Sequence, residues 1–116
     1  MDFSEYQQKA LATAAYDDDD QAFNCIFAGM MGELGELAEK WKKYKRNDDV
    51  KAGMSEIDAY RKFIAGTISE AGDLLWYLAM YLYLFDIDMD KVALTNLNKL
   101  RQRAESGVLH ASGDDR

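Results

Sequence analysis

Apolar residues recur at helical spacing along most of this 116-residue chain, and polar or acidic segments separate the periodic stretches. Proline is absent and strong helix formers such as alanine, leucine and glutamate are abundant, so no helix need be interrupted. The pattern predicts an all-α protein with helices over about residues 5–15, 21–44, 55–85 and 88–107.

The breaks between these helices carry capping and turn signals. Ser4 and Gln7 have the spacing of a capping box, in which the serine hydroxyl accepts a hydrogen bond from a free backbone N–H. The four acids from Asp17 to Asp20 would repel one another along a helix, but negative charge is favourable just ahead of one. We therefore expect this run to form a loop and the cap of the second helix. Residues 47–53 are polar and turn-forming, and they predict another loop.

The two longest predicted helices carry an internal repeat. Residues 26–37 recur 37 positions later as residues 63–74, with a glycine four residues before the first of two acids in each copy. The acids of each pair are three residues apart and therefore share a helix face: Glu33 with Glu36, and Glu70 with Asp73. If the two helices pack antiparallel, four carboxylates and no histidine meet in one place. That donor set suits a hard divalent cation such as Mg²⁺, and hydrolysis of a phosphoanhydride is the natural reaction.

The apolar positions predict where these acids lie relative to the core. In the second helix a stripe that we expect to face the core lies beside the strip with the acids, and it consists of Phe27, Met30, Leu34, Leu37 and Trp41. The acids should therefore be partly dehydrated, which is costly for like charges without a cation. The run from Leu74 to Phe85 is apolar nearly all round, so we expect burial on more than one side, with a subunit interface as the second.

Composition and charge exclude several classes of function. A net charge of −7 argues against a broad nucleic-acid-binding surface, and the longest apolar run, 12 residues, is shorter than the roughly 20 needed to cross a bilayer. The N-terminus has neither the basic start nor the apolar core of a secretory signal. Cys25 is the only cysteine and lies in an apolar run, so we expect a small buried side chain and a cytoplasmic protein.

The acid pairs and their surroundings resemble the MazG-like nucleoside triphosphate pyrophosphohydrolases, an all-α superfamily that also contains dimeric dUTPases and dCTP pyrophosphatases. The signature of that superfamily is Glu-x-x-Glu on one helix and Glu-x-x-Asp on a later one. The similarity extends over nearly the whole chain, through Tyr6-Gln7, Gly32-Glu33-Leu34-Gly35-Glu36, Gly72-Asp73-Leu74-Leu75-Trp76, Asn96-Leu97 and the closing Gly113-Asp114-Asp115-Arg116.

The resemblance implies one MazG-like domain over residues 1–116, folded as a four- to five-helix bundle that forms a homodimer or homotetramer. It implies Mg²⁺, with Mn²⁺ as a substitute, and cleavage of a nucleoside triphosphate between the α and β phosphates. The implied metal ligands and catalytic residues are Glu33, Glu36, Glu70 and Asp73. The implied substrate-binding residues are Lys40, Lys43, Asn96 and Lys99, with Asp114 and Arg116 closing over the nucleotide.

Two other interpretations stay open at this point. The chain could be a non-catalytic helical module that binds a partner through residues 74–85, with its acids serving only solubility. It could also keep the fold and the metal but act on another pyrophosphate-containing compound. The alternative catalytic centres are weak, because the sequence has no Gly-Lys-Ser/Thr phosphate loop and no Glu-x-x-His motif of a di-iron site.

Overall fold

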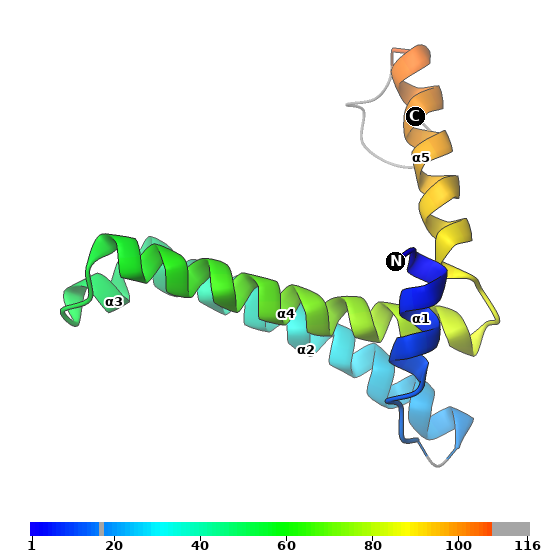
Figure 1. Ribbon diagram of the computed structural model, residues 1–116, viewed down its shortest axis with the longest axis horizontal. Helices are drawn as coiled ribbons and strands as arrows, with labels where there is room; N and C mark the ends of the chain where they lie inside the picture. The colour runs from blue at the N-terminus through cyan, green and yellow to red at the C-terminus, as the bar shows by residue number, and fades with distance from the viewer. Residues whose placement is uncertain (17, 108–116) are drawn as a thin grey trace.

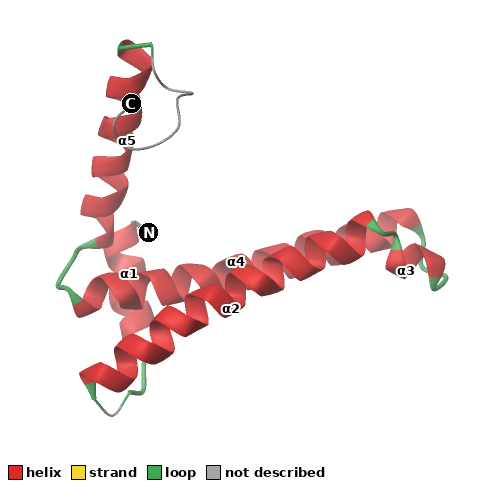
Figure 2. Ribbon diagram, turned by 180° about the vertical axis from the view of Figure 1, so that it is seen from behind, coloured by secondary structure: helices red, strands yellow, loops and turns green. Residues whose placement is uncertain are grey.

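The structure is a computed structural model that describes residues 1–16 and 18–107, and over those residues it is helical without strands (Figures 1 and 2). The all-α prediction is confirmed. The helices are α1 (Phe3–Leu11), α2 (Asp19–Lys45), α3 (Asp48–Lys51), α4 (Glu56–Leu84) and α5 (Met89–Glu105). The loop predicted over residues 47–53 is wrong in part, because α3 forms one helical turn there.

Carboxylate or hydroxyl side chains cap α1, α2, α4 and α5, but the cap of α1 differs from the predicted one. Asp18 accepts a hydrogen bond from the Gln21 N–H at 2.7 Å, so the acidic run does cap α2. The N-cap of α1, however, is Asp2 and not Ser4. The Ser4 hydroxyl instead donates to Asp88 and Asp90 at the start of α5, which ties the two helix starts together.

The long helices α2 and α4 pack side by side as an antiparallel hairpin, with α3 at its closed end (Figure 1). At the other end α1 lies across the hairpin, and α5 leaves in a different direction (Figure 1). The radius of gyration is 18.0 Å, whereas a compact domain of this length would have about 13 Å. The described chain is therefore an open arrangement of helices, and much of its apolar surface is exposed.

The buried core lies at the end of the hairpin that α1 crosses. Its members are small or flexible apolar residues from four helices: Ala10, Ala22, Ile26, Ala79, Met80, Leu82 and Met89. The buried amide of Gln7 fastens α1 to the turn that follows α4. It donates to the carbonyls of Ala79 and Ile87 at 3.1 and 3.0 Å and accepts from the Met89 N–H.

The stripe predicted to face the core is largely exposed, which corrects the sequence interpretation. Phe27, Leu34 and Trp41 are 50%, 52% and 54% exposed. The helix α4 packs instead against the neighbouring face of α2, where Ile26 is 1% exposed and the backbone of Gly29 comes close. The prediction of a buried Cys25 is wrong as well, because this side chain is exposed.

The apolar run in α4 is covered from two sides within the chain. Both α1 and α2 pack on α4, and Ala79, Met80 and Leu82 are buried. Its last positions are not covered, since Tyr83 and Phe85 are 47% and 53% exposed. Packing by α1 and α2 thus accounts for burial on two sides of this run, while Leu78 is 37% exposed.

Candidate metal centre

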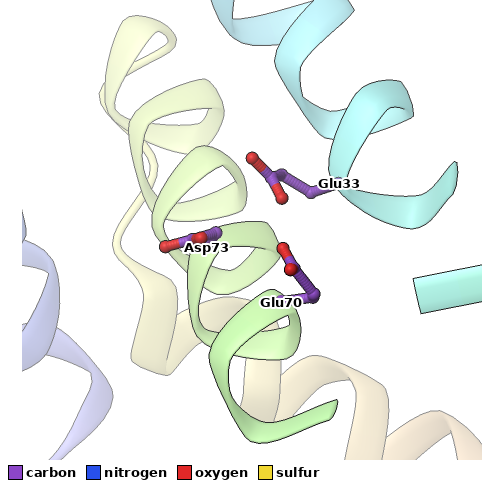
Figure 3. Close-up of side chains that lie close together, drawn as sticks. All are labelled: Glu33, Glu70 and Asp73. Carbon is purple, nitrogen blue, oxygen red and sulfur yellow. The ribbon is translucent and has the colours of Figure 1, made fainter. Parts of the chain in front are cut away.

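Three of the four predicted acids meet between the two long helices. Glu33 projects from α2 toward Glu70 and Asp73, which project from α4 (Figure 3). One carboxylate oxygen of each lies within 4.8 Å of the others. In residues 1–16 and 18–107 no other set of three or more acidic, histidine or cysteine side chains comes together so closely. The predicted juxtaposition of both acid motifs therefore occurs within one chain.

Two glycines set the register that brings the acids together. A Cβ atom on Gly29 would lie 2.3 Å from the ring of Tyr77, so this ring packs directly on the backbone of α2. A Cβ atom on Gly66 would lie 2.8 Å from Cδ of Lys40, so the lysine stem crosses the backbone of α4. The two crossings are related by the sequence repeat, since Gly29 and Gly66 are 37 positions apart and so are Lys40 and Tyr77. They account for the glycine that precedes each acid pair.

The same register explains the positions of the four acids. In an antiparallel pair fixed by the Gly29–Tyr77 and Gly66–Lys40 crossings, Glu33 lies level with Asp73, and Glu36 lies level with Glu70. Glu36 is exposed and is not part of the group of three. It lies close enough for its charge to contribute to the raised pKa of Glu33.

The acids are electrostatically strained in the absence of a cation. Loss of solvent around the carboxyl raises the pKa of Glu33, and a hydrogen bond with Glu70 and the charges of Asp73, Glu70 and Glu36 raise it further. The side chain of Glu70 is 17% exposed, while Asp73 is exposed to solvent. Hard oxygen donors that crowd together in this way fit a divalent cation, whose charge would offset their repulsion.

One positive charge already lies at this cluster. Nζ of Lys40 is 3.2 Å from a carboxylate oxygen of Glu70. This ion pair links α2 to α4. Of its two side chains, Glu70 is the more shielded from solvent. Lys40 was predicted as a substrate-binding residue, and in the structure its contact is with a predicted metal ligand.

A cavity opens between α2, α3 and α4, further along the hairpin from the acid cluster. Its volume is about 470 Å³, and Lys40 and Lys43 line it together with the rings of Tyr44 and Phe63, whose centroids are 4.6 Å apart. Lys62 also lines the cavity and pairs with Asp49 at 2.9 Å. None of Glu33, Glu70 and Asp73 lines this cavity, and Lys40, which pairs with Glu70, is the lining residue that connects it to the acid cluster.

Tyr6 is a neighbour of the cluster that the sequence interpretation did not assign to the site. Burial raises its pKa first, and the charge of Asp73 raises it further. The phenol comes from α1, far from the acid motifs in sequence, and local spacing could not reveal it. Tyr6 was visible only as part of the family resemblance.

The remaining predicted residues lie apart from the cluster or outside the described residues. Asn96 and Lys99 are exposed residues of α5, which packs near its start against α1 and extends away from the α2–α4 hairpin (Figure 1). Asp114 and Arg116 fall in the segment 108–116, outside the described residues. The structure therefore does not bring Asn96 and Lys99 to the acids of their own chain.

Comparisons with known proteins identify a family whose matched region includes nearly all of the α2–α4 hairpin. The family model of the MazG nucleotide pyrophosphohydrolase domain matches residues 21–108, which include both motifs. The chain is also 34% identical over 116 residues to the Gene 37 protein of Mycobacterium phage L5, covering 96% of each chain. No solved structure matches it significantly.

This chain belongs to the MazG nucleotide pyrophosphohydrolase family. The family is typically metal-dependent, and membership supports an enzyme of the pyrophosphohydrolase type. In the parts of the chain that the structure describes, no helix is long and apolar enough to span a membrane.

Proposed function

We propose that this protein hydrolyses a ribo- or deoxyribonucleoside triphosphate between the α and β phosphates, with Mg²⁺ as cofactor and Mn²⁺ as a possible substitute. The products are a nucleoside monophosphate and pyrophosphate. The observation that carries the proposal is the convergence of Glu33, Glu70 and Asp73 within 4.8 Å in a chain of the MazG family. A non-catalytic module would have no need to crowd these charges.

In this proposal Glu33, Glu70 and Asp73 hold the metal, and Glu36 joins them from its position level with Glu70. When bound, the cation would offset negative charge on the polyphosphate and make an attacking water more acidic. The carboxylates also keep their fixed places on two packed helices, which orients the reacting groups without a costly rearrangement. Lys40 and Lys43 would contact the phosphates from the wall of the neighbouring cavity.

The cavity supports a nucleotide as the substrate. Lys40 lines it and also pairs with Glu70, it is large enough for a nucleoside, and Tyr44 and Phe63 offer aromatic surface on which a base can stack. Another pyrophosphate-containing compound would satisfy the same acids, so the base-binding surface is the part of the proposal that turnover must test.

The experiment is product analysis with a panel of nucleoside and deoxynucleoside triphosphates, in Mg²⁺ and in EDTA. The proposal predicts metal-dependent release of monophosphate and pyrophosphate, with loss of turnover in Glu36→Gln and Asp73→Asn. Glu39→Gln is the matched control, because Glu39 lies one turn from Glu36 on α2 but pairs with Lys42 at 3.0 Å. Release of inorganic phosphate and a diphosphate, or turnover in EDTA, would contradict the proposed reaction.

We further propose that the chain acts as a homodimer or homotetramer. Four exposed apolar residues of α2 and four of α4 occupy repeat-related positions, and the antiparallel packing of the two copies places such positions on one face of the pair. These residues are Phe23, Phe27, Met31 and Trp41 on α2, and Tyr60, Ile64, Ile68 and Leu78 on α4. An apolar face of this extent favours burial against another subunit.

Light scattering after size exclusion tests this assembly. Phe27→Glu and Ile64→Glu should each reduce the oligomer to monomers. Ala65→Glu introduces the same charge at an exposed position next to Ile64 in sequence but on another side of α4, and it should leave the mass unchanged. A wild-type protein that remains monomeric at high concentration would refute the proposal.

Asn96 and Lys99 fit this assembly if α5 of one subunit serves the site of another. We infer this arrangement because α5 extends away from the hairpin of its own chain (Figure 1). Mixing the inactive variants Lys99→Met and Glu70→Gln after unfolding and refolding should then restore part of the activity, since some mixed sites contain neither substitution. No recovery in mixed oligomers would contradict a contribution from another subunit.

A further inference from the structure

The ion pair between Lys40 and Glu70 has a feature that phosphate binding alone does not explain. To reach Glu70, the lysine stem passes over α4 at Gly66, where even a methyl group would lie 2.8 Å from Cδ and 3.2 Å from Cε. The nitrogen then lies 3.2 Å from Glu70 Oε1. The Lys40 side chain therefore extends from α2 across the backbone of α4 to a predicted metal ligand.

The repeat offers a built-in comparison for this side chain. Tyr77 is the residue of α4 at the position equivalent to Lys40, and its neutral ring fills the corresponding crossing over Gly29. An uncharged residue therefore suffices for packing at such a crossing. The choice of a lysine on the α2 side places a single cation at the acid cluster, and packing does not require it.

This cation and a divalent ion would compete for the same carboxylate. The Lys40 ammonium neutralises part of the charge of Glu33, Glu70 and Asp73, and it would be repelled by a divalent ion held between them. Lys40 also lines the cavity described above, so its ammonium can rotate into that cavity when it leaves Glu70.

We propose that Lys40 is a positioning residue that sets the metal affinity of this site. It holds the Glu70 carboxylate in the cluster while no divalent ion is bound, and it must be displaced from that carboxylate when the ion enters. This inference rests on the proposed metal centre, and it adds that the nucleotide-free site is tuned toward weaker metal binding by a residue of its own.

Titration calorimetry of Mg²⁺ and Mn²⁺ into the nucleotide-free protein tests the inference. Lys40→Met keeps the length of the stem and removes the charge, and it should tighten metal binding by about three- to fivefold, the upper part of the range expected for the loss of one partly exposed ion pair. Lys42→Met is the matched control. It removes the same charge two residues away, from a side chain paired with Glu39, and should change the affinity by less than about twofold.

Gly66→Ala provides a second variant that leaves Lys40 intact. The added methyl group obstructs the path of the stem, so it should move the ammonium off Glu70 and tighten metal binding in the same direction. Unchanged or weaker binding in Lys40→Met would overturn the inference while leaving the metal centre in place. A wild-type protein that binds neither ion would overturn both, so the two failures are distinguishable.

Discussion

The two halves of the acid cluster are copies of one pattern that differ in the residue closing each copy. The α2 half consists of Gly29, Glu33, Glu36 and Lys40, and the α4 half consists of Gly66, Glu70, Asp73 and Tyr77. Each half supplies carboxylates and a glycine, over which the last residue of the other half crosses. The last residue of the α2 half is the flexible cation Lys40, and the last residue of the α4 half is the rigid aromatic Tyr77.

The difference separates two tasks that the same scaffold performs. The Tyr77 ring on Gly29 fixes how closely and in which register α2 and α4 pack, because an aromatic ring cannot bend away. The Lys40 stem on Gly66 adds little rigidity, but it carries charge to Glu70. One crossing is therefore expected to control stability, and the other to control the electrostatics of the site.

The largest expected effect is a loss of activity when either of the two equivalent glutamates is substituted. Glu33→Gln and Glu70→Gln occupy equivalent positions, and each should lower kcat/KM by at least about a hundredfold, because even the outer partners of metal ligands typically cost 10–100-fold. Steady-state turnover of the preferred nucleotide gives the ratio, and thermal unfolding shows that both variants remain folded. A large loss in only one of them would break the equivalence of the halves.

Alanine substitutions at the two glycines should change the free energy of unfolding by different amounts. Gly29→Ala places a methyl group 2.3 Å from the Tyr77 ring, and the forced shift should cost about 1–3 kcal/mol of the free energy of unfolding. Gly66→Ala meets only the lysine stem, and the better helix propensity of alanine, worth up to about 1 kcal/mol, should leave the change near zero. Urea unfolding measures both.

Replacing the ring tests the cause of that difference. Tyr77→Leu removes the clash with the added methyl group, so the cost of Gly29→Ala should shrink in the double variant. If Gly29→Ala destabilises equally with and without the ring, the crossing does not fix the packing of the helices.

The smallest effect is a pH dependence of stability in the metal-free protein. The pKa of Glu33 is raised above its ordinary value of 4.5, so the folded state holds this proton to a higher pH than the unfolded chain. The associated stability is complete below that ordinary value and is lost as pH rises through the raised pKa. Glu33→Gln should therefore be stabilising relative to wild type near pH 7 in EDTA, and this advantage should disappear toward pH 4.

Glu39 gives the opposite sign and serves as the control for that titration. A hydrogen bond with Lys42 lowers the pKa of Glu39 more than the loss of solvent raises it. Its contribution to stability is present above the ordinary value and is lost as pH falls through the lowered pKa. Equal pH profiles for Glu33→Gln and Glu39→Gln, measured by thermal unfolding in EDTA, would contradict the assigned shifts.

The sequence predicted the long helices and the meeting of the acid motifs because both depend on local periodicity and on one repeat. The observed α2 and α4 end within a residue or two of the expected positions, and three of the predicted acids come together. The acidic run was predictable as the cap of α2, where Asp18 takes that role, but the cap of α1 was not, because Asp2 and Ser4 compete there and tertiary contacts engage Ser4.

What the sequence could not reveal is which face of each helix packs within the chain. The stripe with Phe27 and Trp41 is as apolar as a core stripe, yet it is exposed, because the Gly29 and Gly66 crossings rotate the other face toward the partner helix. The path of Lys40 to Glu70 follows from that same register, and the approach of Tyr6 to Asp73 follows from the packing of α1 on α4. Such contacts join residues far apart in sequence, so spacing alone carries no signal for them.

The most direct test of the account is the binding of Mn²⁺ to the nucleotide-free protein, followed by electron paramagnetic resonance in wild type, Glu33→Gln and Glu70→Gln. If carboxylates from both long helices hold the ion, each substitution weakens binding by about tenfold or more, although the two residues belong to different helices. Binding that survives both substitutions unchanged would show that the two acid motifs do not form one metal centre.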